Sequence, residues 1–412
     1  MSRDASPSHL RRTGTAVAAV ALMVAAGCGA AAPAAPGPAP APAPASGPAP
    51  AAPGELRVTE VAGGFSHPWD IGVLPDGRAL VTERGGRISL LASPTPGAAV
   101  TPVAAAQDDV FARGEGGLMG LAVHPDFATG ARFTTCQTHA GGGNPVDVRL
   151  VTWTLSPDGA TATRVADPLV GGLPLAPSGR HSGCRIAVDD TGALVVGTGD
   201  AATGAVPQDL TSLGGKTLRV DPATGGPAAG NPYAGAADPR QRLVYTSGHR
   251  NVQGVAIEPG TGRIVTAEHG PTRDDEVNVL RPGGNHGWDP AQGGTVGGYD
   301  ESVPMTDLDR YPDAVAAAWS SGSPPEALAG AAFLDGPRWG PREGMLAVAA
   351  LRGQKLLLMR LGADGVVADV EIPAVLDGTF GRLRGVRAAP DGALLVTTSN
   401  GTDDRVLRVE TG

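Results

Sequence analysis

From about residue 55 onward, short apolar runs alternate with turn sequences. The segment "WDIGVLPDGRALVTERGGRISLL" reads as strand, Pro-Asp-Gly turn, strand, Gly-Gly turn and strand. The same pattern recurs in "CRIAVDDTGALVVGTGD", "GVAIEPGTGRIVTAEHG" and "GVRAAPDGALLVTTSNG". Because proline fixes one backbone φ angle of such a turn and glycine supplies a positive one, each unit is typical of a β-hairpin. No segment longer than a turn or two has a helical period.

The repeated hairpins predict an all-β fold. At roughly 40–60 residues per blade, a folded part of this length allows six to eight blades of a β-propeller. A β-sandwich is the alternative, but so many similar hairpins over so long a stretch favour radial repetition. In a propeller each blade contributes loops to one central face, where the functional residues of different blades would meet.

The N-terminal 54 residues do not follow this pattern. Residues 1–28 have a basic start, an apolar run and small residues before Cys28, as in a signal peptide with a lipobox whose cysteine is lipidated. An ordinary signal peptide with an incidental cysteine is the alternative. Residues 29–54 are almost only Ala, Pro and Gly and predict an extended, disordered linker. We therefore expect an exported protein, lipid-anchored on the extracytoplasmic side of the cell membrane, whose folded domain spans residues 55–412.

The net charge limits the kinds of binding partner to expect, and the cysteine content bears on whether the protein contains a disulfide. A formal net charge of -9 gives no reason to expect nucleic acid or an anionic membrane surface as a partner, so the lipid anchor is the only membrane contact expected. Besides Cys28, the chain has Cys136 and Cys184. In an exported protein this even remainder predicts a disulfide, and two free buried thiols are the alternative.

One hairpin carries a candidate acid–base pair. His181 precedes the strand "CRIAV", and Asp200 follows the next strand, "ALVVGTG". If the turn lies at Asp190–Gly192, both residues flank the same end of the hairpin and lie side by side. A carboxylate beside a histidine fixes its tautomer and stabilises the imidazolium, as a general base requires. A purely structural pair of loop residues is the alternative.

Other polar residues also stand at strand ends. Four of them directly precede an apolar strand: His249, Arg250, Asn251 and Gln253. The loop "TAEHGPTRDDEVNV" is rich in the oxygen ligands that calcium prefers. Arg382 and Arg384 alternate in a predicted strand and would share a face. They would repel each other unless they meet an anion, such as a carboxylate-bearing ligand, or acidic neighbours on a solvated face.

Taken together, these segments resemble the glucose/sorbosone dehydrogenase family, the soluble aldose dehydrogenases that use pyrroloquinoline quinone (PQQ). The resemblance covers essentially the whole folded part. It is carried by "GEGGLMGLAVHPDF", "RHSGCRIAVDDTGALVVGTGD", "LGGKTLRVD", "GHRNVQGVAIEP", "EHGPTRDDEVNVLRPGGNHGW" and "GRLRGVRAAPDGALLVTTS". It implies a six-bladed propeller with the quinone on the central face, a sugar or related alcohol as substrate, a lactone or acid as product, and an external electron acceptor.

The resemblance also implies residue roles. His181 matches the general base, which takes the hydroxyl proton while hydride passes from the anomeric carbon to the quinone, and Asp200 matches its partner. Arg250 would stabilise the negative charge that develops on the quinone. Further matches are quinone contacts at Asn251, Arg382 and Arg384, carbonyl ligands of an activating Ca²⁺ at Gly270 and Pro271, and a ligand of a second, structural Ca²⁺ at Glu276.

Some positions depart from the family pattern. Glu115 stands where glutamine is frequent, and Arg352 stands where some members have lysine. We include both among the expected quinone contacts, although a glutamate beside a tricarboxylate is unfavourable unless it is protonated or turned away. Cys184, Gly385 and His286 also replace common family residues. The alternatives to a quinoprotein are a non-catalytic lipid-anchored propeller that binds carbohydrate or a protein partner, and a calcium-dependent hydrolase or lactonase.

Overall fold

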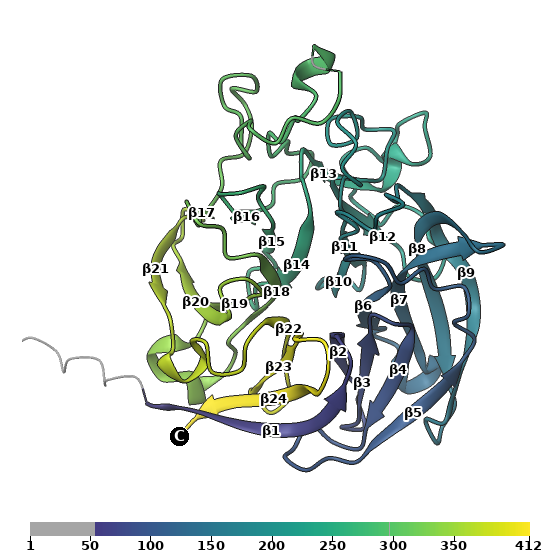
Figure 1. Cartoon of the computed structure of the whole chain (residues 1–412), viewed down its shortest axis with the longest axis vertical. Coiled ribbons are helices and arrows are strands. Elements are labelled where there is room, and N and C mark those ends of the chain that lie inside the picture. Colours follow the sequence, from purple (N-terminus) through teal and green to yellow (C-terminus); the bar gives the residue numbers. More distant parts are fainter. Residues whose placement is uncertain (1–53, 296) are drawn as a thin grey trace, which may run out of the picture. The chain divides into compact units, whose positions relative to one another are not determined.

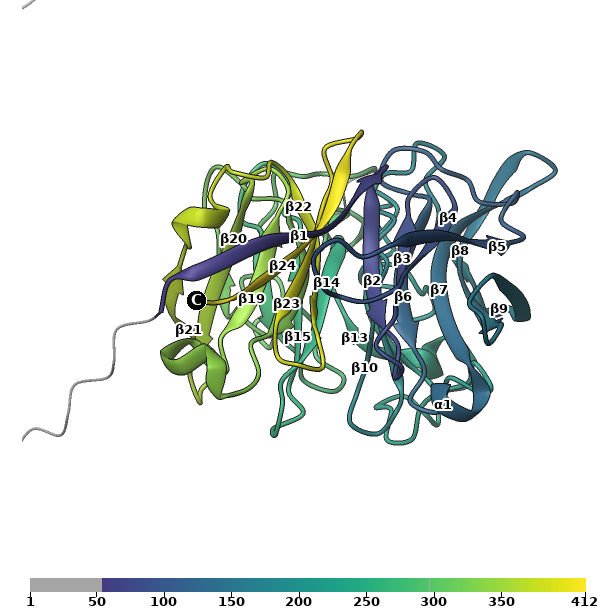
Figure 2. The ribbon, with the colours of Figure 1, turned by 90° about the horizontal axis from the view of Figure 1, so that it is seen from below.

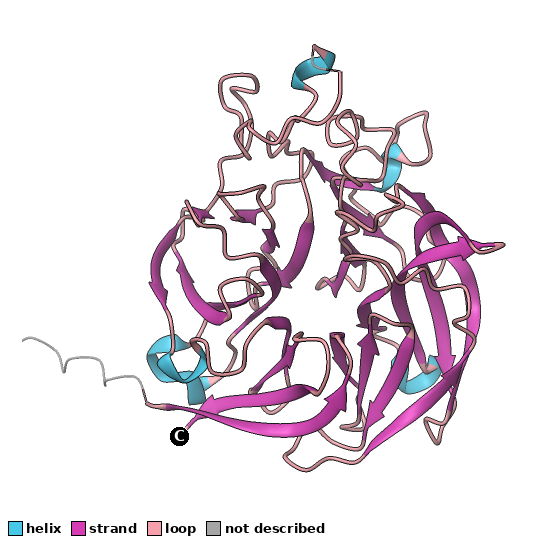
Figure 3. Cartoon of the chain, viewed as in Figure 1, coloured by secondary structure: helices cyan, strands magenta, loops and turns pink. Residues whose placement is uncertain are grey.

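The structure, a computed structural model, describes residues 54–295 and 297–412, and in them nearly all regular structure is β (Figure 3). The helical turns of this part are α1 (Phe127–Gly130), η1 (Gln241–Leu243), η2 (Gln292–Gly294), η3 (Pro337–Arg342) and η4 (Ala374–Leu376). None of its helices is long and apolar enough to cross a membrane. The prediction of an all-β fold is confirmed. The predicted signal peptide, the lipidation site at Cys28 and nearly all of the linker lie outside the described residues.

Four of the sheets have four strands each. They are β10 (Arg185–Val188) with β11 (Leu194–Gly197), β12 (Lys216–Val220) and β13 (Val244–Ser247); β14 (Val252–Ile257) with β15 (Ile264–Glu268), β16 (Glu276–Val279) and β17 (Trp319–Ser320); β18 (Leu328–Phe333) with β19 (Leu346–Ala350), β20 (Lys355–Leu361) and β21 (Val367–Glu371); and β22 (Leu383–Ala388) with β23 (Leu394–Thr398), β24 (Asp404–Thr411) and β1 (Leu56–Phe65). Neighbouring strands in these sheets are antiparallel, as expected for hairpin connections.

A fifth sheet has eight strands. It joins the meander β2 (Pro68–Val73), β3 (Ala79–Glu83), β4 (Arg87–Leu91) and β5 (Val100–Ala105) to the meander β6 (Leu118–Val123), β7 (Arg132–Gly141), β8 (Asn144–Leu155) and β9 (Thr161–Leu173). The link is a short parallel pairing of the outer strands β5 and β9, in which Ala104 faces Thr161 and Ala105 faces Ala162.

The sheets are arranged around a central axis as the blades of a β-propeller (Figure 1). The inner strands contact one another in the closed order β2, β6, β10, β14, β18, β22 and back to β2. The ring closes where β1, from the N-terminal side, pairs with β24 near the C-terminus, and the two strands lie side by side in Figure 2. Because this pairing ties the two ends of the folded part together, neither end leaves an open sheet edge between blades.

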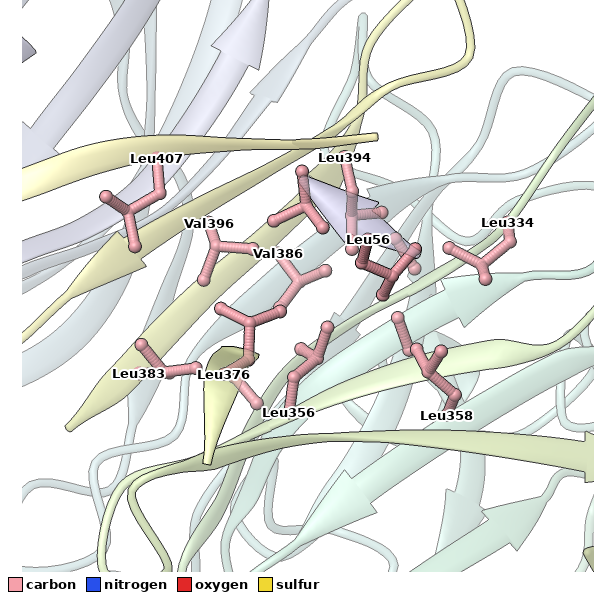
Figure 4. Packing of buried hydrophobic residues seen from close by; sticks show 14 of the residues in the cluster. Leu56, Leu334, Leu356, Leu358, Leu376, Leu383, Val386, Leu394, Val396 and Leu407 are labelled. Atoms are coloured by element: carbon pink, nitrogen blue, oxygen red, sulfur yellow. The ribbon is translucent and has the colours of Figure 1, made fainter. Parts of the chain in front are cut away.

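Apolar side chains fill the spaces between neighbouring sheets. In the cluster of Figure 4, Leu394 and Val396 of β23 pack with Leu356 and Leu358 of β20, so the last sheet packs against the one before it. These side chains are almost fully buried, and truncating one leucine to alanine in such a core costs about 2–5 kcal/mol. The inner strands are buried on both faces, which explains why they read as continuous apolar runs in the sequence.

A buried ionic network crosses the centre of the ring. Asp70 of β2 is fully buried and forms ion pairs with Arg185 of β10 (2.7 Å) and Arg387 of β22 (3.2 Å). It also accepts a hydrogen bond from the backbone N–H of Leu121 in β6 (3.0 Å). The Arg185 guanidinium lies 4.0 Å from the ring centroid of Trp69. One carboxylate therefore connects four inner strands and fixes their spacing under the functional face.

Candidate active site

The candidate residues come from loops at one end of the inner strands. In each four-stranded meander, the loop entering the first strand and the loop joining the second and third strands lie at the same end of the sheet. The loops that enter an inner strand carry Glu115, His181, Arg250 and Asn251, and loops after a second strand carry Asp200 and Gly270. The propeller thus gathers residues that are far apart in the sequence on one central face.

The hairpin β10–β11 brings His181 and Asp200 together. Its turn is held by Asp189, whose Oδ1 accepts the backbone N–H groups of Thr191 (2.9 Å) and Ala193 (3.0 Å). At the other end, His181 Nδ1 lies 2.8 Å from Asp200 Oδ1. The two side chains are 3% and 0% exposed. A solvated surface pair would contribute little, whereas this pair is shielded from water and therefore strong.

Asp200 is fixed by further donors. Its Oδ1 also accepts the N–H of Ala202 (2.8 Å), and its Oδ2 accepts the indole N–H of Trp288 (2.9 Å) and the hydroxyl of Tyr299 (2.6 Å). Burial and the nearby Asp200 charge raise the pKa of Tyr299, so the phenol stays protonated and donates. With the carboxylate beside it, His181 carries its proton on Nδ1. Nε2 has no hydrogen-bond partner among the described residues and is therefore able to accept a proton from a ligand.

Arg250 lies in the loop that enters the adjacent inner strand, β14. Its Nη1 donates to the carbonyl of His269 (3.0 Å), its Nη2 pairs with Glu301, and its guanidinium lies 5.8 Å from the Trp288 ring centroid. Its Nε is buried and has no partner within the described part of the chain. Burial opposes ionisation of Glu301, but its contacts with Arg250 and Arg180 hold the pKa of its carboxyl below the ordinary value. Arg250 thus keeps its Nε N–H as an unused donor.

The side chains of Glu115 and Asn251 are hydrogen-bonded to each other. Asn251 Nδ2 donates to Glu115 Oε2 (2.8 Å), and the same oxygen accepts Gln253 Nε2 (3.3 Å). Asn251 Oδ1 accepts the backbone N–H of Gly183 (3.1 Å), which connects this group to the loop of His181. The Glu115 carboxylate is therefore turned toward the two amide groups at the start of β14.

Three arginines lie near one another at this end: Arg84, Arg382 and Arg384. None of them forms an ion pair with a carboxylate of the described residues. Arg384 is buried, donates to Gln253 Oε1 (3.0 Å), and has its pKa lowered to about 9 by burial and by the charge of Arg185. Arg382 is exposed, and Arg84 is half-buried. Such a concentration of arginines without a direct ion-pair partner favours an anionic ligand. Together with the unused Nε of Arg250, it fits a ligand with several carboxylates.

Two parts of the site are relevant to metal binding. No group of three or more His, Cys, Asp or Glu side chains within residues 54–295 and 297–412 is arranged to hold a metal ion. Gly270 and Pro271 lie on the loop after β15, where the Gly270 N–H donates to Asp275 Oδ1 (2.7 Å) and braces the loop. Any metal there would be held by backbone carbonyl oxygens, which are hard ligands suited to Ca²⁺.

Glu276 lies in the second part, a buried group of polar side chains with Asn278 and Glu268. Asn278 Nδ2 donates to Glu276 Oε2 (3.3 Å) and to Glu268 Oε1 (2.7 Å). Burial and the neighbouring Glu268 raise the pKa of Glu276 to about 8. The carbonyl oxygen of Asn278 is buried and has no partner in the described part of the chain. Two adjacent carboxylates and an unpaired carbonyl oxygen fit a bound cation, which would relieve their repulsion.

Two other predicted features lie apart from these contacts. Arg352 is exposed in the turn between β19 and β20, where its backbone N–H donates to the Glu326 carbonyl (2.9 Å). Its side chain makes no hydrogen bond or ion pair with the described residues of the site. Cys136 of β7 and Cys184, directly before β10, form a disulfide with a Cα–Cα distance of 6.2 Å.

Sequence reasoning missed several contributors. Trp288 and Tyr299 come from the long connection between β16 and β17, and Arg84 follows β3. Trp288 lies within the quoted segment "NHGW", but its position in the sequence gives no sign that its N–H reaches Asp200. Tyr299 and Arg84 lie outside the segments that carried the resemblance. Their roles follow only from contacts between blades.

Known proteins are similar to this chain in sequence and fold. The sequence profile described as Glucose / Sorbosone dehydrogenase matches residues 65–408. The chain belongs to the glucose/sorbosone dehydrogenase family. The match covers all the inner strands and every candidate residue of the folded part.

One sequence relative of this chain is the aldose sugar dehydrogenase YliI of Escherichia coli K12. It is 28% identical over 358 residues, which cover 86% of this chain and 93% of the relative. A Thermus thermophilus structure described as a glucose dehydrogenase has 40% identity and a TM-score of 0.71, covering 86% of this chain and 99% of that one. The PQQ-bound aldose sugar dehydrogenase of Streptomyces coelicolor has 32% identity and a TM-score of 0.69, covering 88% and 99%.

Proposed function

We propose that this protein is a PQQ-dependent dehydrogenase of aldose sugars or related alcohols, built on a six-bladed propeller in which the eight-stranded sheet counts as two blades. The observation that carries the proposal is the buried His181–Asp200 pair, whose free Nε2 lies at the same end of the ring as the arginine cluster. A base oriented by a buried carboxylate, beside an anion-binding surface, is the combination that such a reaction requires.

The residues take the following roles. Bound PQQ supplies a two-electron acceptor for the hydride that leaves the anomeric carbon as the sugar becomes a lactone. His181 Nε2 takes the proton of the anomeric hydroxyl, and Asp200 stabilises the resulting imidazolium. Arg382 and Arg384 bind carboxylates of the cofactor, and Arg250, through its unused Nε, and Asn251 bind its oxygens. Arg352 is exposed on the same side of its blade and remains a candidate contact there.

Calcium belongs to the same proposal. The carbonyl oxygens of Gly270 and Pro271 would hold one Ca²⁺ beside the cofactor. Glu276 would ligate a second, structural Ca²⁺, supported by the unpaired Asn278 oxygen and the adjacent Glu268. We also propose that the protein is exported and lipid-anchored at Cys28, since residues 1–54 read as a lipobox signal followed by a Pro-rich linker, and that it passes electrons to an external acceptor.

The test reconstitutes the purified protein with PQQ and Ca²⁺ and assays a panel of aldoses with an artificial electron acceptor. We expect turnover in the wild type and loss of turnover in His181→Ala, with PQQ binding retained. His139→Ala is the matched control, because His139 on β7 also pairs with a carboxylate, Asp109 (3.0 Å), but makes no hydrogen bond or ion pair with a candidate residue of the site within the described part of the chain. Turnover in the control should equal that of the wild type.

The outcomes separate the alternatives. Absence of PQQ binding and of turnover across the panel would leave a non-catalytic propeller. Turnover in His181→Ala at the wild-type rate would remove His181 from its role as base while leaving the cofactor assignment intact.

A further inference from the structure

Glu115 is a negative charge among groups suited to bind anions. Its partially buried carboxylate is hydrogen-bonded to Asn251 and Gln253. Gln253 in turn accepts from Arg384 (3.0 Å), so Gln253 links Glu115 to one of the proposed carboxylate-binding arginines through two hydrogen bonds. An amide in this place would be neutral, whereas a carboxylate repels an incoming anion.

The two carboxylate oxygens have different surroundings. Oε2 accepts both amide N–H groups, whereas Oε1 accepts no side-chain hydrogen bond within the described residues and is not fully buried. The backbone N–H of His181 also favours the charged carboxylate. The titratable groups that act on Glu115 are His181 before β10, His269 after β15 and Arg384 of β22. A proton on Oε1 would leave both bonds to Oε2 in place.

Without a ligand, Glu115 is ionised at neutral pH. Burial alone would raise the pKa of its carboxyl, but His269, His181 and the Asn251 amide outweigh burial and hold the pKa below its ordinary value. A tricarboxylate placed beside it acts in the opposite direction, because a second negative charge favours the protonated form.

We propose that Glu115 takes up one proton when the quinone binds, so that its carboxyl group changes from an acceptor into a hydrogen-bond donor toward the ligand. The inference rests on the proposed function, because it requires an anionic cofactor at this site. A protonated glutamate with its O–H on Oε1 and its carbonyl on Oε2 has the donor and acceptor pattern of a glutamine side chain. Glu115 therefore acts as a pH-dependent determinant of cofactor affinity, where a glutamine would bind equally well at every pH.

The test measures PQQ binding to the apo-protein in the presence of Ca²⁺ between pH 6 and 9. Isothermal titration in two buffers of different ionisation enthalpy counts the protons taken up, and tryptophan fluorescence gives the dissociation constant. In the wild type we expect uptake of about one proton and a dissociation constant that rises up to about tenfold per pH unit. In Glu115→Gln about one proton fewer should be taken up, and affinity at high pH should exceed that of the wild type.

Glu258→Gln is the matched control, because Glu258 follows the other end of β14 and pairs with Arg263. It should behave as the wild type. If Glu115→Gln does not fold, the buffer comparison on the wild type still tests the proposal, because binding without proton uptake refutes it. Binding without proton uptake, or an equal uptake in wild type and Glu115→Gln, would overturn the role of Glu115 and leave the proposed function standing. Absence of PQQ binding in all three proteins would instead refute the proposed function.

Discussion

The substitution Asp200→Asn tests the chemistry of the site most directly, because asparagine cannot serve the four donors that the carboxylate accepts. His181 Nδ1 and the Ala202 N–H bond one oxygen at 2.8 Å each, and Trp288 Nε1 (2.9 Å) and the Tyr299 hydroxyl (2.6 Å) bond the other. Asparagine has one acceptor oxygen and one NH₂ group. One of the two pairs of donors around residue 200 must therefore face the NH₂ group, which is itself a donor.

Both orientations of the amide are unfavourable, for different reasons. If the NH₂ group faces Trp288, the buried indole N–H loses its acceptor, which costs about 1–3 kcal/mol of stability. If it faces His181, the imidazole must accept at Nδ1, and its proton moves to Nε2, where the base is needed. In either case the charge that stabilises the imidazolium is lost, a contribution of about 1.5–3 kcal/mol or about 10- to 150-fold in rate. With the wrong tautomer added, we expect kcat to fall by about 10²- to 10⁴-fold.

The assay is steady-state turnover of PQQ- and Ca²⁺-loaded protein as a function of pH, together with a PQQ titration. The PQQ affinity should change little, because the Asp200 carboxylate makes no hydrogen bond or ion pair with the arginines proposed to bind the cofactor, and its contact with Arg250 is between backbone groups (2.9 Å) that the substitution leaves in place. Asp109→Asn removes the carboxylate partner of His139 and serves as the control. A kcat of Asp200→Asn within threefold of the wild type, with an unchanged pH profile, would refute the reasoning.

Three further predictions concern stability and cofactor binding. Asp70→Asn leaves the buried Arg185 uncompensated, so the free energy of unfolding should fall by about 3–5 kcal/mol in a urea titration, and a loss below about 1 kcal/mol would contradict the network. Arg384→Gln should weaken PQQ binding at least about tenfold in a fluorescence titration while circular dichroism stays unchanged, and an unaltered affinity would exclude Arg384 as a contact. Burial lowers the pKa of His124 to about 4, so between pH 4 and 6.5 the unfolded chain binds more protons and stability is lost as pH falls, by up to about 1.4 kcal/mol per pH unit. His124→Gln should flatten the urea-midpoint profile in that window, and an equal slope in the variant would show that another group titrates.

Local sequence was sufficient for the strands and for the pairing of His181 with Asp200. Turn residues such as Asp189 and Gly192 act over a few positions, and a hairpin places its two ends side by side whatever the rest of the chain does. The repetition of such units also favoured a propeller, because a long series of similar hairpins has few other ways to bury its apolar faces. The disulfide between Cys136 and Cys184 also followed from the even number of cysteines that remain besides Cys28, and the structure contains it.

The surroundings of those residues were decided by the tertiary structure. Strand alternation predicted a shared face for Arg382 and Arg384, but Arg382 precedes β22 and is exposed, whereas Arg384 is buried near an irregularity in the β22–β23 register between Leu383 and Val386. The direction of the Glu115 carboxylate depends on amides from β14, two blades along the ring.

The sequence by itself therefore determined the elements, because their signals are short-range, and it marked the residues able to do chemistry at their ends. Only the tertiary structure decided what those residues meet. Trp288 and Tyr299 reach Asp200 from nearly a hundred residues away, and Arg250 pairs with Glu301, which lies in the connection between β16 and β17. Such contacts follow from the closure of the ring, which sets the distance between blades and which no local pattern encodes.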